Sequence, residues 1–172
     1  MPSCAQMRKT TAGADLVEIE AVYRRRLPEL RRVAAAITGG RETGCDAVQD
    51  AFAMAVHRRD QFRGDGSLEA WLWRIVVHSA RDLAGRAANR PTTQLHETNA
   101  APIEPAEQVP DGLHTLVSEL PERQRLALFL RYYADLDYAA IADALEISSG
   151  TVGATLTQAR DNLRRLMTGV RS

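Results

Sequence analysis

The chain has 172 residues, which is enough for one ordinary domain or for two small ones. Its 22 basic and 22 acidic residues give a formal net charge of zero, which argues against a uniformly basic nucleic-acid-binding protein. The charge is unevenly distributed, because residues 1–90 carry an excess of basic side chains and residues 91–112 carry acidic ones only. Any electrostatic attraction of nucleic acid must therefore come from local patches.

Cysteine content and hydropathy restrict the class of protein further. Cys4 and Cys45 are the two cysteines, and they fit a reduced, cytoplasmic protein better than a disulfide scaffold. No Cys/His cluster has the spacing of a zinc site, so we expect no structural metal. The first 14 residues lack the apolar core of a signal peptide, and no run approaches the ~18 apolar residues of a membrane helix. We therefore expect no insertion into a membrane.

The N-terminal part begins with 14 residues that we expect to be disordered, followed by a helix over residues 15–38. Pro28 lies inside this helix and should kink or divide it, and Gly39-Gly40 should end it. The arginines at 24–26 and 31–32 are interpreted as a solvated face rather than a DNA site. The apolar stripe consists of Leu16, Ile19, Tyr23, Leu27, Leu30, Ala34 and Ile37.

A second helix is predicted over residues 41–59. One face is apolar, and another face carries acidic and amide side chains. From the residues alone, the polar face is best interpreted as a routine solvent face. The apolar face holds Cys45, Val48, Phe52 and Val56, and the polar face holds Asp46, Gln49, Asp50 and Ala53.

Residues 60–67 form a loop rich in Gly, Asp and Ser, and Ser67 should cap a third helix over residues 67–88. On this helix, three basic side chains at spacings of four and three residues make a strip suited to phosphates or base edges. Trp71 is expected in the core, whereas Trp73 is the better candidate for contact with melted DNA. The strip is Arg74, His78 and Arg81, and the predicted inner side is Leu68, Trp71, Leu72, Ile75, Ser79 and Leu83.

Residues 91–111 carry four prolines, four acidic residues and no basic ones, which predicts a flexible linker without fixed structure. A passive tether and an acidic mimic of nucleic acid are equally good interpretations of this segment.

The stretch from Leu120 to Met167 contains a helix-turn-helix pattern. A short helix over 138–145 follows Asp137 as N-cap, and Ser148 can cap the next helix after the turn at 146–148. The second helix buries Val152, Leu156, Ala159, Leu163 and Leu166, and its opposite face holds Thr151, Thr155, Gln158, Arg160, Arg164 and Arg165. A buried stripe behind a polar face is how a recognition helix enters a major groove, although a purely structural helical hairpin has the same pattern.

Three segments carry a resemblance to a known family. The segments LPERQR with the following helix-turn-helix, DAVQDAF, and FRGDGSLEAWLWRIVVH are similar to regions 4 and 2 of bacterial RNA polymerase sigma factors of the small extracytoplasmic-function class (group IV). The resemblance implies an all-α fold with two small helical domains joined by a flexible linker. Region 2 would cover residues 15–90, and the region 4 helix-turn-helix would cover residues 112–168.

The resemblance implies a transcription initiation factor that binds core RNA polymerase, recognises the −10 and −35 promoter elements and assists promoter melting. The face with Asp46, Gln49 and Asp50 would dock on the β′ clamp helices, and the C-terminal domain would contact the β flap. The loop after the second helix would capture a base flipped out of the DNA. The −10 contacts would be Arg63, Asp65, Ser67, Trp73, Arg74, His78 and Arg81, and the −35 contacts would be Arg123, Arg131, Ser149, Thr151, Thr155, Gln158 and Arg160.

The chain departs from the family pattern at several positions. His78 stands where the family usually has Asn, and Glu146 replaces the usual turn glycine. Gly153, Ala154 and Thr155 replace a Lys-Ser-Arg run, so we expect weaker or altered −35 binding, with polymerase docking supplying much of the affinity.

The alternative function is a helix-turn-helix regulator that binds duplex DNA as a dimer without core polymerase. The DAVQDAF face and the FRGDGS loop argue against it, because a reader of duplex DNA needs neither. We predict no catalytic residue, cofactor, metal or small-molecule substrate, since no nucleophile–base pair or phosphate loop is present. The resemblance also implies an anti-sigma protein as a partner.

Overall fold

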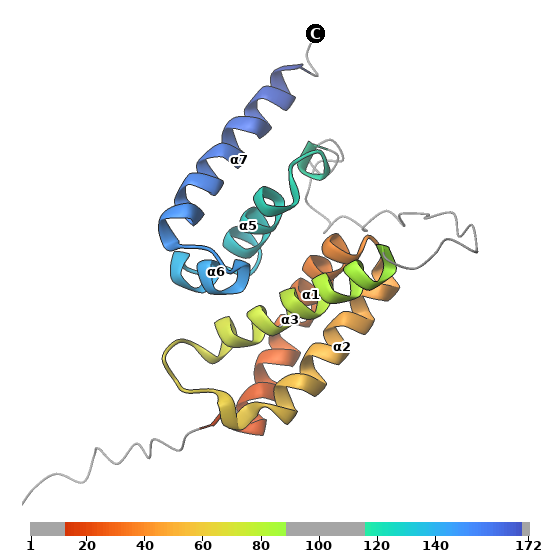
Figure 1. The fold of residues 1–172 in the computed structure, drawn as a ribbon, viewed down its shortest axis with the longest axis vertical. Helices are drawn as coiled ribbons and strands as arrows, with labels where there is room; N and C mark the ends of the chain where they lie inside the picture. The colour runs from red at the N-terminus through yellow and green to blue at the C-terminus, as the bar shows by residue number, and fades with distance from the viewer. Residues whose placement is uncertain (1–12, 89–115, 170–172) are drawn as a thin grey trace, which may run out of the picture.

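The computed structural model describes residues 13–88 and 116–169, and within these ranges the chain is helical with no strand (Figure 1). The N-terminal half contains α1 (Leu16–Thr38), α2 (Arg41–His57), the short 3-10 helix η1 (Arg59–Gln61) and α3 (Leu68–Ala88). The C-terminal half contains α5 (Glu122–Tyr132), α6 (Tyr138–Leu145) and α7 (Ser149–Gly169). The predicted all-α fold is confirmed, whereas most of the predicted disordered N-terminus and the whole linker lie outside the described residues.

The N-terminal half is a bundle in which α1, α2 and α3 pack against one another. Gly44 allows α1 and α2 to approach closely, because a Cβ at this position would lie 2.6 Å from the backbone nitrogen of Ala35. Gly39 ends α1 in the left-handed conformation, with φ of 79°, and its N–H donates to the carbonyl of Ala35. A tight turn and a glycine contact therefore set the geometry of the first two helices.

Pro28 does not divide α1, which runs without interruption from Leu16 to Thr38. The predicted division is wrong because Pro28 lies on the exposed side of the helix. The carbonyl that loses its partner at a helical proline, that of Arg24, also belongs to an exposed residue and can be hydrated by water.

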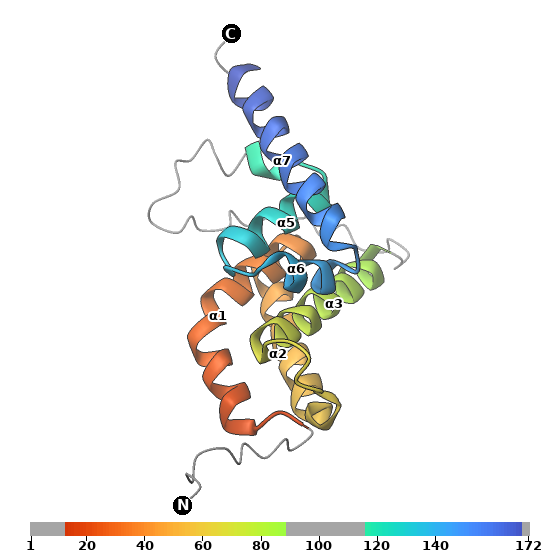
Figure 2. The ribbon, with the colours of Figure 1, turned by 90° about the vertical axis from the view of Figure 1, so that its left-hand side faces the viewer.

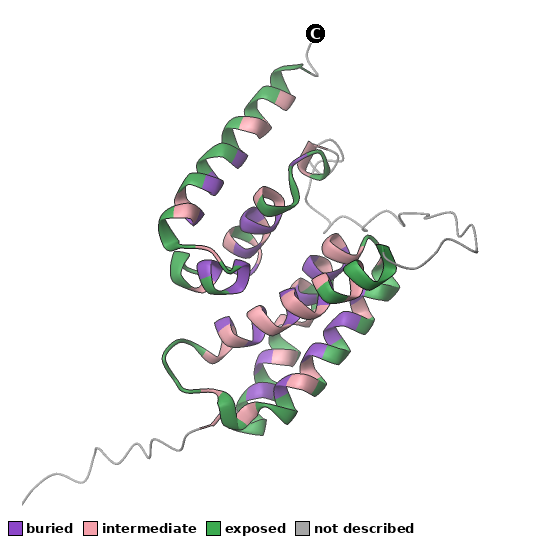
Figure 3. Cartoon of the chain, viewed as in Figure 1, coloured by how far each residue is buried: buried purple, intermediate pink, exposed green. Residues whose placement is uncertain are grey.

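Helix α3 lies between the two halves of the molecule. It packs against α1 and α2 on one side and against α6 on the other (Figures 1 and 2). Consequently, no residue from 68 to 81 is exposed, and buried side chains of both halves form one continuous cluster (Figure 3). The outer helices differ, since Leu16 and Val56, which were predicted in buried stripes, are 47% and 39% exposed.

The C-terminal half is built as the sequence predicts, with α5 packed on α6 and α7. Asp137 caps α6 by accepting a hydrogen bond from Ala140 N at 2.8 Å, and Ser148 Oγ accepts from Thr151 N at 3.1 Å at the start of α7. Glu146 ends α6 in the left-handed conformation, with φ of 56°. The turn of the helix-turn-helix thus places a charged residue where glycine is usually favoured.

Candidate nucleic-acid and protein interfaces

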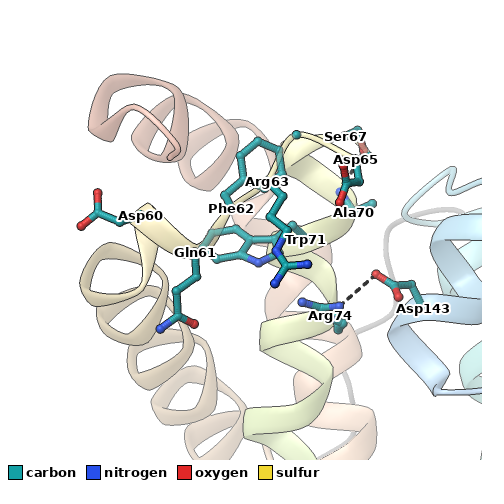
Figure 4. A pocket seen from close by; sticks show the side chains of 12 residues that line it. Asp60, Gln61, Phe62, Arg63, Asp65, Ser67, Ala70, Trp71, Arg74 and Asp143 are labelled. Carbon is teal, nitrogen blue, oxygen red and sulfur yellow. Dashed lines mark hydrogen bonds and ion pairs between the residues drawn. The ribbon is translucent and has the colours of Figure 1, made fainter. Parts of the chain in front are cut away.

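A polar cavity of about 680 Å³ lies between η1, the following loop and the start of α3 (Figure 4). One wall is aromatic, because the rings of Phe62 and Trp71 meet with centroids 5.5 Å apart. The guanidinium group of Arg63 is directed toward Trp71 and Arg74. The lining residues are Asp60, Gln61, Phe62, Arg63, Gly64, Asp65, Gly66, Ser67, Ala70, Trp71, Arg74 and Asp143.

The loop over this cavity is joined to α3 by a helix cap. Gly64 adopts a φ of 76°, and Ser67 caps α3 by accepting a hydrogen bond from Ala70 N at 3.0 Å, as predicted. Glu69, in the first turn of α3, binds two arginines of α1, with 2.8 Å to Arg25 Nη2 and 2.6 Å to Arg26 Nε. This carboxylate ties the cavity wall to α1, and it gives a structural role to arginines that the sequence had assigned to a solvated face.

The two tryptophans of α3 have exchanged roles relative to the prediction. Trp73 is fully buried, with 0% exposure, so it cannot contact melted DNA while the molecule is packed in this way. Its indole nitrogen has no hydrogen-bond partner within the described residues. Trp71, which was expected in the core, is only half-buried and forms part of the cavity wall. Helix α3 is packed on two sides, so its apolar stripe alone could not show which tryptophan faces outward.

The basic strip of α3, formed by Arg74, His78 and Arg81, lies against acidic residues of the C-terminal half. We call these contacts the three interdomain ion pairs. His78 forms an ion pair only when its imidazole is protonated. The pairs are Arg74 Nη1–Asp143 Oδ2 at 3.2 Å, His78 Nε2–Glu146 Oε1 at 3.6 Å and Arg81 Nε–Glu122 Oε1 at 3.4 Å.

The exposed face of α7 differs from the predicted one at Thr155. Thr155 is 5% exposed, so its predicted contact with a base is wrong, because the residue lies on the side of α7 that packs inward. The neighbouring Ala154 and Thr157 are exposed, and neither was predicted as a −35 contact. Of the other predicted −35 contacts, Ser149, Gln158 and Arg160 are exposed and Thr151 is half-buried.

The two arginines predicted on α5 are not equivalent. Arg123 is exposed, whereas Arg131 donates to the carbonyl of Leu136 at 3.0 Å and pairs with Asp135 at 3.5 Å. Arg131 therefore braces the turn between α5 and α6, and it is less available to a phosphate than Arg123.

The polar face of α2 lies free on the opposite side of the bundle core. Asp46, Gln49 and Asp50 are all exposed, and none of them makes a hydrogen bond or ion pair within the described residues. An exposed face with two carboxylates and one amide suits a partner surface that is basic and donates hydrogen bonds.

Comparison with known proteins decides the family. The sigma-70 region 2 family matches residues 22–90, and the sigma-70 region 4 family matches residues 111–163. The ECF RNA polymerase sigma factor SigM of Mycobacterium tuberculosis is 30% identical over 170 residues, which cover 96% of this chain and 85% of SigM. The chain belongs to the extracytoplasmic-function sigma factors. The ECF sigma-E factor of Escherichia coli K12 is 29% identical over 132 residues, covering 67% of this chain and 69% of that factor.

Two solved structures share the fold of this chain. CnrH in complex with the cytosolic domain of CnrY has a TM-score of 0.66 and 22% identity, covering 91% of both chains. The sigma factor RpoE in complex with the anti-sigma factor NepR, from Bartonella quintana, has a TM-score of 0.67 and 22% identity, covering 89% of this chain and 98% of that one.

Membership of this family makes the chain a transcription initiation factor, and its relatives are sigma factors rather than enzymes. No helix within the described residues combines the length and the apolar composition needed to cross a bilayer.

Proposed function

We propose that this sigma factor opens promoter DNA by holding one unstacked base in the cavity between η1 and α3. The observation that carries the proposal is the position of Trp71 in the wall of a polar cavity of about 680 Å³. An indole face can stack on a base of any sequence, while polar groups around it meet the base edge. The cavity volume is within the range of sites for small molecules, which fits a single nucleotide.

The polar side chains around Trp71 have two proposed roles, contact with the edge of the base and contact with the flanking phosphates. Asp65 and Ser67 supply an acceptor and a hydroxyl for the edge of the base. Arg63 and Arg74 supply positive charge for the phosphates that flank an extruded nucleotide. In this proposal, Trp71 in the cavity wall makes the contact with unstacked −10 DNA that the sequence analysis had assigned to Trp73.

The exposed face of α2 is the proposed polymerase-docking surface, defined as Asp46, Gln49 and Asp50. These side chains have no hydrogen-bond or ion-pair partner within the described residues, so a basic surface can pair with them without first breaking an existing contact. Charge complementarity at such a surface accelerates association and fixes its orientation. The resemblance assigns the corresponding partner surface to the β′ clamp helices.

The exposed side of α7 is the proposed −35 reader, with Ser149, Gln158 and Arg160 as its polar contacts. This set of contacts includes a single arginine, so binding of these residues to duplex DNA should release few counterions and depend weakly on salt. Two elements about 25 base pairs apart are separated by about 85 Å along the helix axis. The 27 residues between α3 and residue 116 can span at most about 95 Å, so the chain is long enough for the two halves to separate and read both elements.

The proposed setting is the cytoplasm, where core polymerase acts, with a regulatory protein as a further partner. The structures of CnrH and RpoE contain a bound cytosolic domain and an anti-sigma factor, respectively. A protein of that kind would hold this sigma factor until a signal releases it.

Run-off transcription tests the proposed function. Purified protein, core RNA polymerase and a library of genomic fragments are combined, and transcripts that require the protein are sequenced. Discrete start sites preceded by shared −10 and −35 sequences are expected. The absence of transcripts together with the absence of core binding would overturn the proposal.

A further inference from the structure

The N-terminal part of α7 exposes a surface without charge. Residues 149–159 contain no charged side chain, and the buried residues of this segment are Val152, Thr155, Leu156 and Ala159. Ala154 is exposed, and Thr157 and Gln158 follow it three and four residues later, which places all three on the opposite side of the helix. We call these three residues the reading face of α7. Beyond the first turn, the helix therefore offers two methyl groups and one amide to a partner.

The hydroxyl group of Thr157 is engaged within the helix. Its Oγ1 donates to the carbonyl of Gly153 at 2.9 Å. The hydroxyl hydrogen is therefore not available to a base, and the γ-methyl group is left for contact. The methyl group of Ala154 is exposed one turn earlier. Both side chains thus present an apolar group that suits the C5-methyl group of thymine in the major groove.

Gln158 supplies the hydrogen-bonding groups of the reading face. It is exposed, and its amide makes no hydrogen bond within the described residues. A carboxamide offers a donor and an acceptor side by side, and adenine presents the matching N7 acceptor and N6 donor in the major groove. Guanine presents two acceptors there, N7 and O6, so an amide can satisfy one of them only. Gln158 therefore favours adenine over guanine.

The arginines further along α7 bind groups of their own helix. The contacts are Arg160 Nε to the Leu156 carbonyl at 3.2 Å, Arg164 Nη1 to Asp161 Oδ1 at 2.7 Å, and Arg165 to the Asn162 amide oxygen. The terminal nitrogens of Arg160 remain for a phosphate, a contact that carries no sequence information. Guanine is most often read by a bidentate arginine or lysine, and the reading face contains neither.

We propose that α7 reads A·T pairs in the −35 element, with Gln158 binding an adenine while the methyl groups of Ala154 and Thr157 contact thymines. This inference rests on the proposed function for the entry of α7 into the major groove. A bidentate contact of this kind should favour adenine by about 5- to 150-fold over another base. Each thymine methyl group should add about 2- to 4-fold.

Selection of promoter fragments tests the proposal. Holoenzyme, assembled from the full chain and core polymerase, is incubated with fragments that keep the −10 element and carry a randomised −35 element, and the bound fragments are sequenced. The wild type should enrich A·T pairs at neighbouring positions. Enrichment of G·C pairs at the positions that respond to changes in the reading face would overturn the proposal.

A change at Gln158 identifies the adenine contact. Gln158→Glu should move the preference at one position from adenine to cytosine, because a carboxylate accepts a hydrogen bond from cytosine N4. The matched control, Thr168→Glu, adds the same charge at an exposed position near the end of α7 and should leave every preference unchanged. An unchanged preference for adenine in Gln158→Glu would overturn the assignment.

The methyl contact is tested by changing both partners. Thr157→Ser keeps the hydroxyl group that binds the Gly153 carbonyl and removes only the methyl group. Deoxyuridine, placed at each enriched thymine in turn, removes the methyl group of the base. Each single change should weaken holoenzyme binding about 2- to 4-fold, and at one thymine the two changes together should cost no more than one of them. Additive losses at every thymine would overturn this contact.

The selection also distinguishes this inference from the proposed function. A holoenzyme that enriches a guanine-containing −35 element leaves the proposed function standing and overturns the inference. A chain that does not bind core polymerase, or a holoenzyme that enriches no −35 sequence, counts against the proposed function and the inference together.

Discussion

Helices α2 and α3 belong to the same bundle but are packed differently. Helix α2 contacts its neighbours on one side, and its opposite side, with Asp46 and Asp50, is exposed. Helix α3 is covered by the bundle on one side and by α6 on the other, so none of its residues from 68 to 81 is exposed. A single apolar stripe describes a helix with one buried face, and it fails for a helix that lies between two domains.

The same difference has a functional consequence. The proposed polymerase-docking surface on α2 is free in this arrangement, whereas the basic strip on α3, which is proposed to meet DNA, is paired with the C-terminal half. The proposed polymerase contact is therefore accessible in this arrangement, whereas the basic strip of α3 is not. The predictions below test this contrast between a free helix face and a covered one.

The largest expected effect is on stability, at the covered helix. Trp73→Ala should lower the free energy of unfolding by about 3–5 kcal/mol, because a fully buried indole leaves a cavity when it is truncated. Trp71→Ala should cost less than half as much, since this side chain is only half-buried. Urea denaturation of both variants measures the difference, and equal losses would contradict the exchanged roles of the two tryptophans.

At the free helix, Asp50→Arg should weaken binding to core polymerase by about 100-fold or more, because it replaces an attractive charge with a repulsive one. The unfolding free energy should stay within about 0.5 kcal/mol, since Asp50 is exposed. Co-elution with core polymerase measures the loss. Asp82→Arg, at an exposed position on α3, makes the same charge change away from the docking surface. Co-elution that survives Asp50→Arg would mean that the docking surface is misplaced.

Trp71→Ala should slow promoter opening by about 10-fold or more, because stacking of a base on an aromatic ring contributes about 1–3 kcal/mol. Binding to core polymerase should be unchanged, since Trp71 lies away from the docking surface. Fluorescence of 2-aminopurine placed through the −10 element follows opening directly. Trp71→Phe keeps an aromatic face and should restore most of the rate, whereas a full loss in both variants would point to a structural role.

Glu69→Gln should destabilise the protein by about 1 kcal/mol, because a largely buried carboxylate that binds Arg25 and Arg26 would lose its charge. Glu20→Gln is the matched control, since Glu20 pairs with Arg24 at 2.6 Å but both side chains are more than half exposed. The control should lose less than about 0.5 kcal/mol in thermal or urea unfolding. A similar loss in both variants would show that Glu69 does not anchor α3.

The smallest expected effect is a gain in stability in α7. Gly153→Ala should stabilise the protein by about 0.5–1 kcal/mol, because alanine is favoured over glycine within a helix. The added Cβ would meet Tyr138 Cε2 at 3.6 Å, which is an ordinary contact. A decrease in the midpoint of thermal unfolding would show that Gly153 is needed for a closer approach of α6 and α7.

Local chemistry could be predicted from the sequence, whereas contacts between the halves could not. Ser67, Asp137 and Ser148 were identified as N-caps from neighbouring residues alone, because an N-cap depends only on the next turn of backbone. The burial of Trp73 depends on packing between helices that are distant in sequence, and the pairing of Arg74 with Asp143, 69 residues away, depends on how α6 lies on α3.

The predicted exposure of Thr155 on α7 was wrong for a different reason. Thr155 lies at the edge of the apolar stripe, so a small change in the orientation of the helix decides whether a polar residue there is exposed or covered. The substitution of Thr155 by arginine is therefore a poor test of DNA binding, because a long charged side chain would be forced into a buried position. Ala154 is exposed and offers a better position for a basic residue.

The most direct test of the account compares DNA binding with and without polymerase. End-labelled fragments that yield run-off transcripts are incubated with the purified protein alone, with core polymerase alone and with both, and bound DNA is resolved by electrophoretic mobility. The account predicts sequence-specific complexes only when the protein and core polymerase are both present. Equally tight, sequence-specific binding by the protein alone would contradict it, because the promoter-reading surfaces would then be accessible without polymerase.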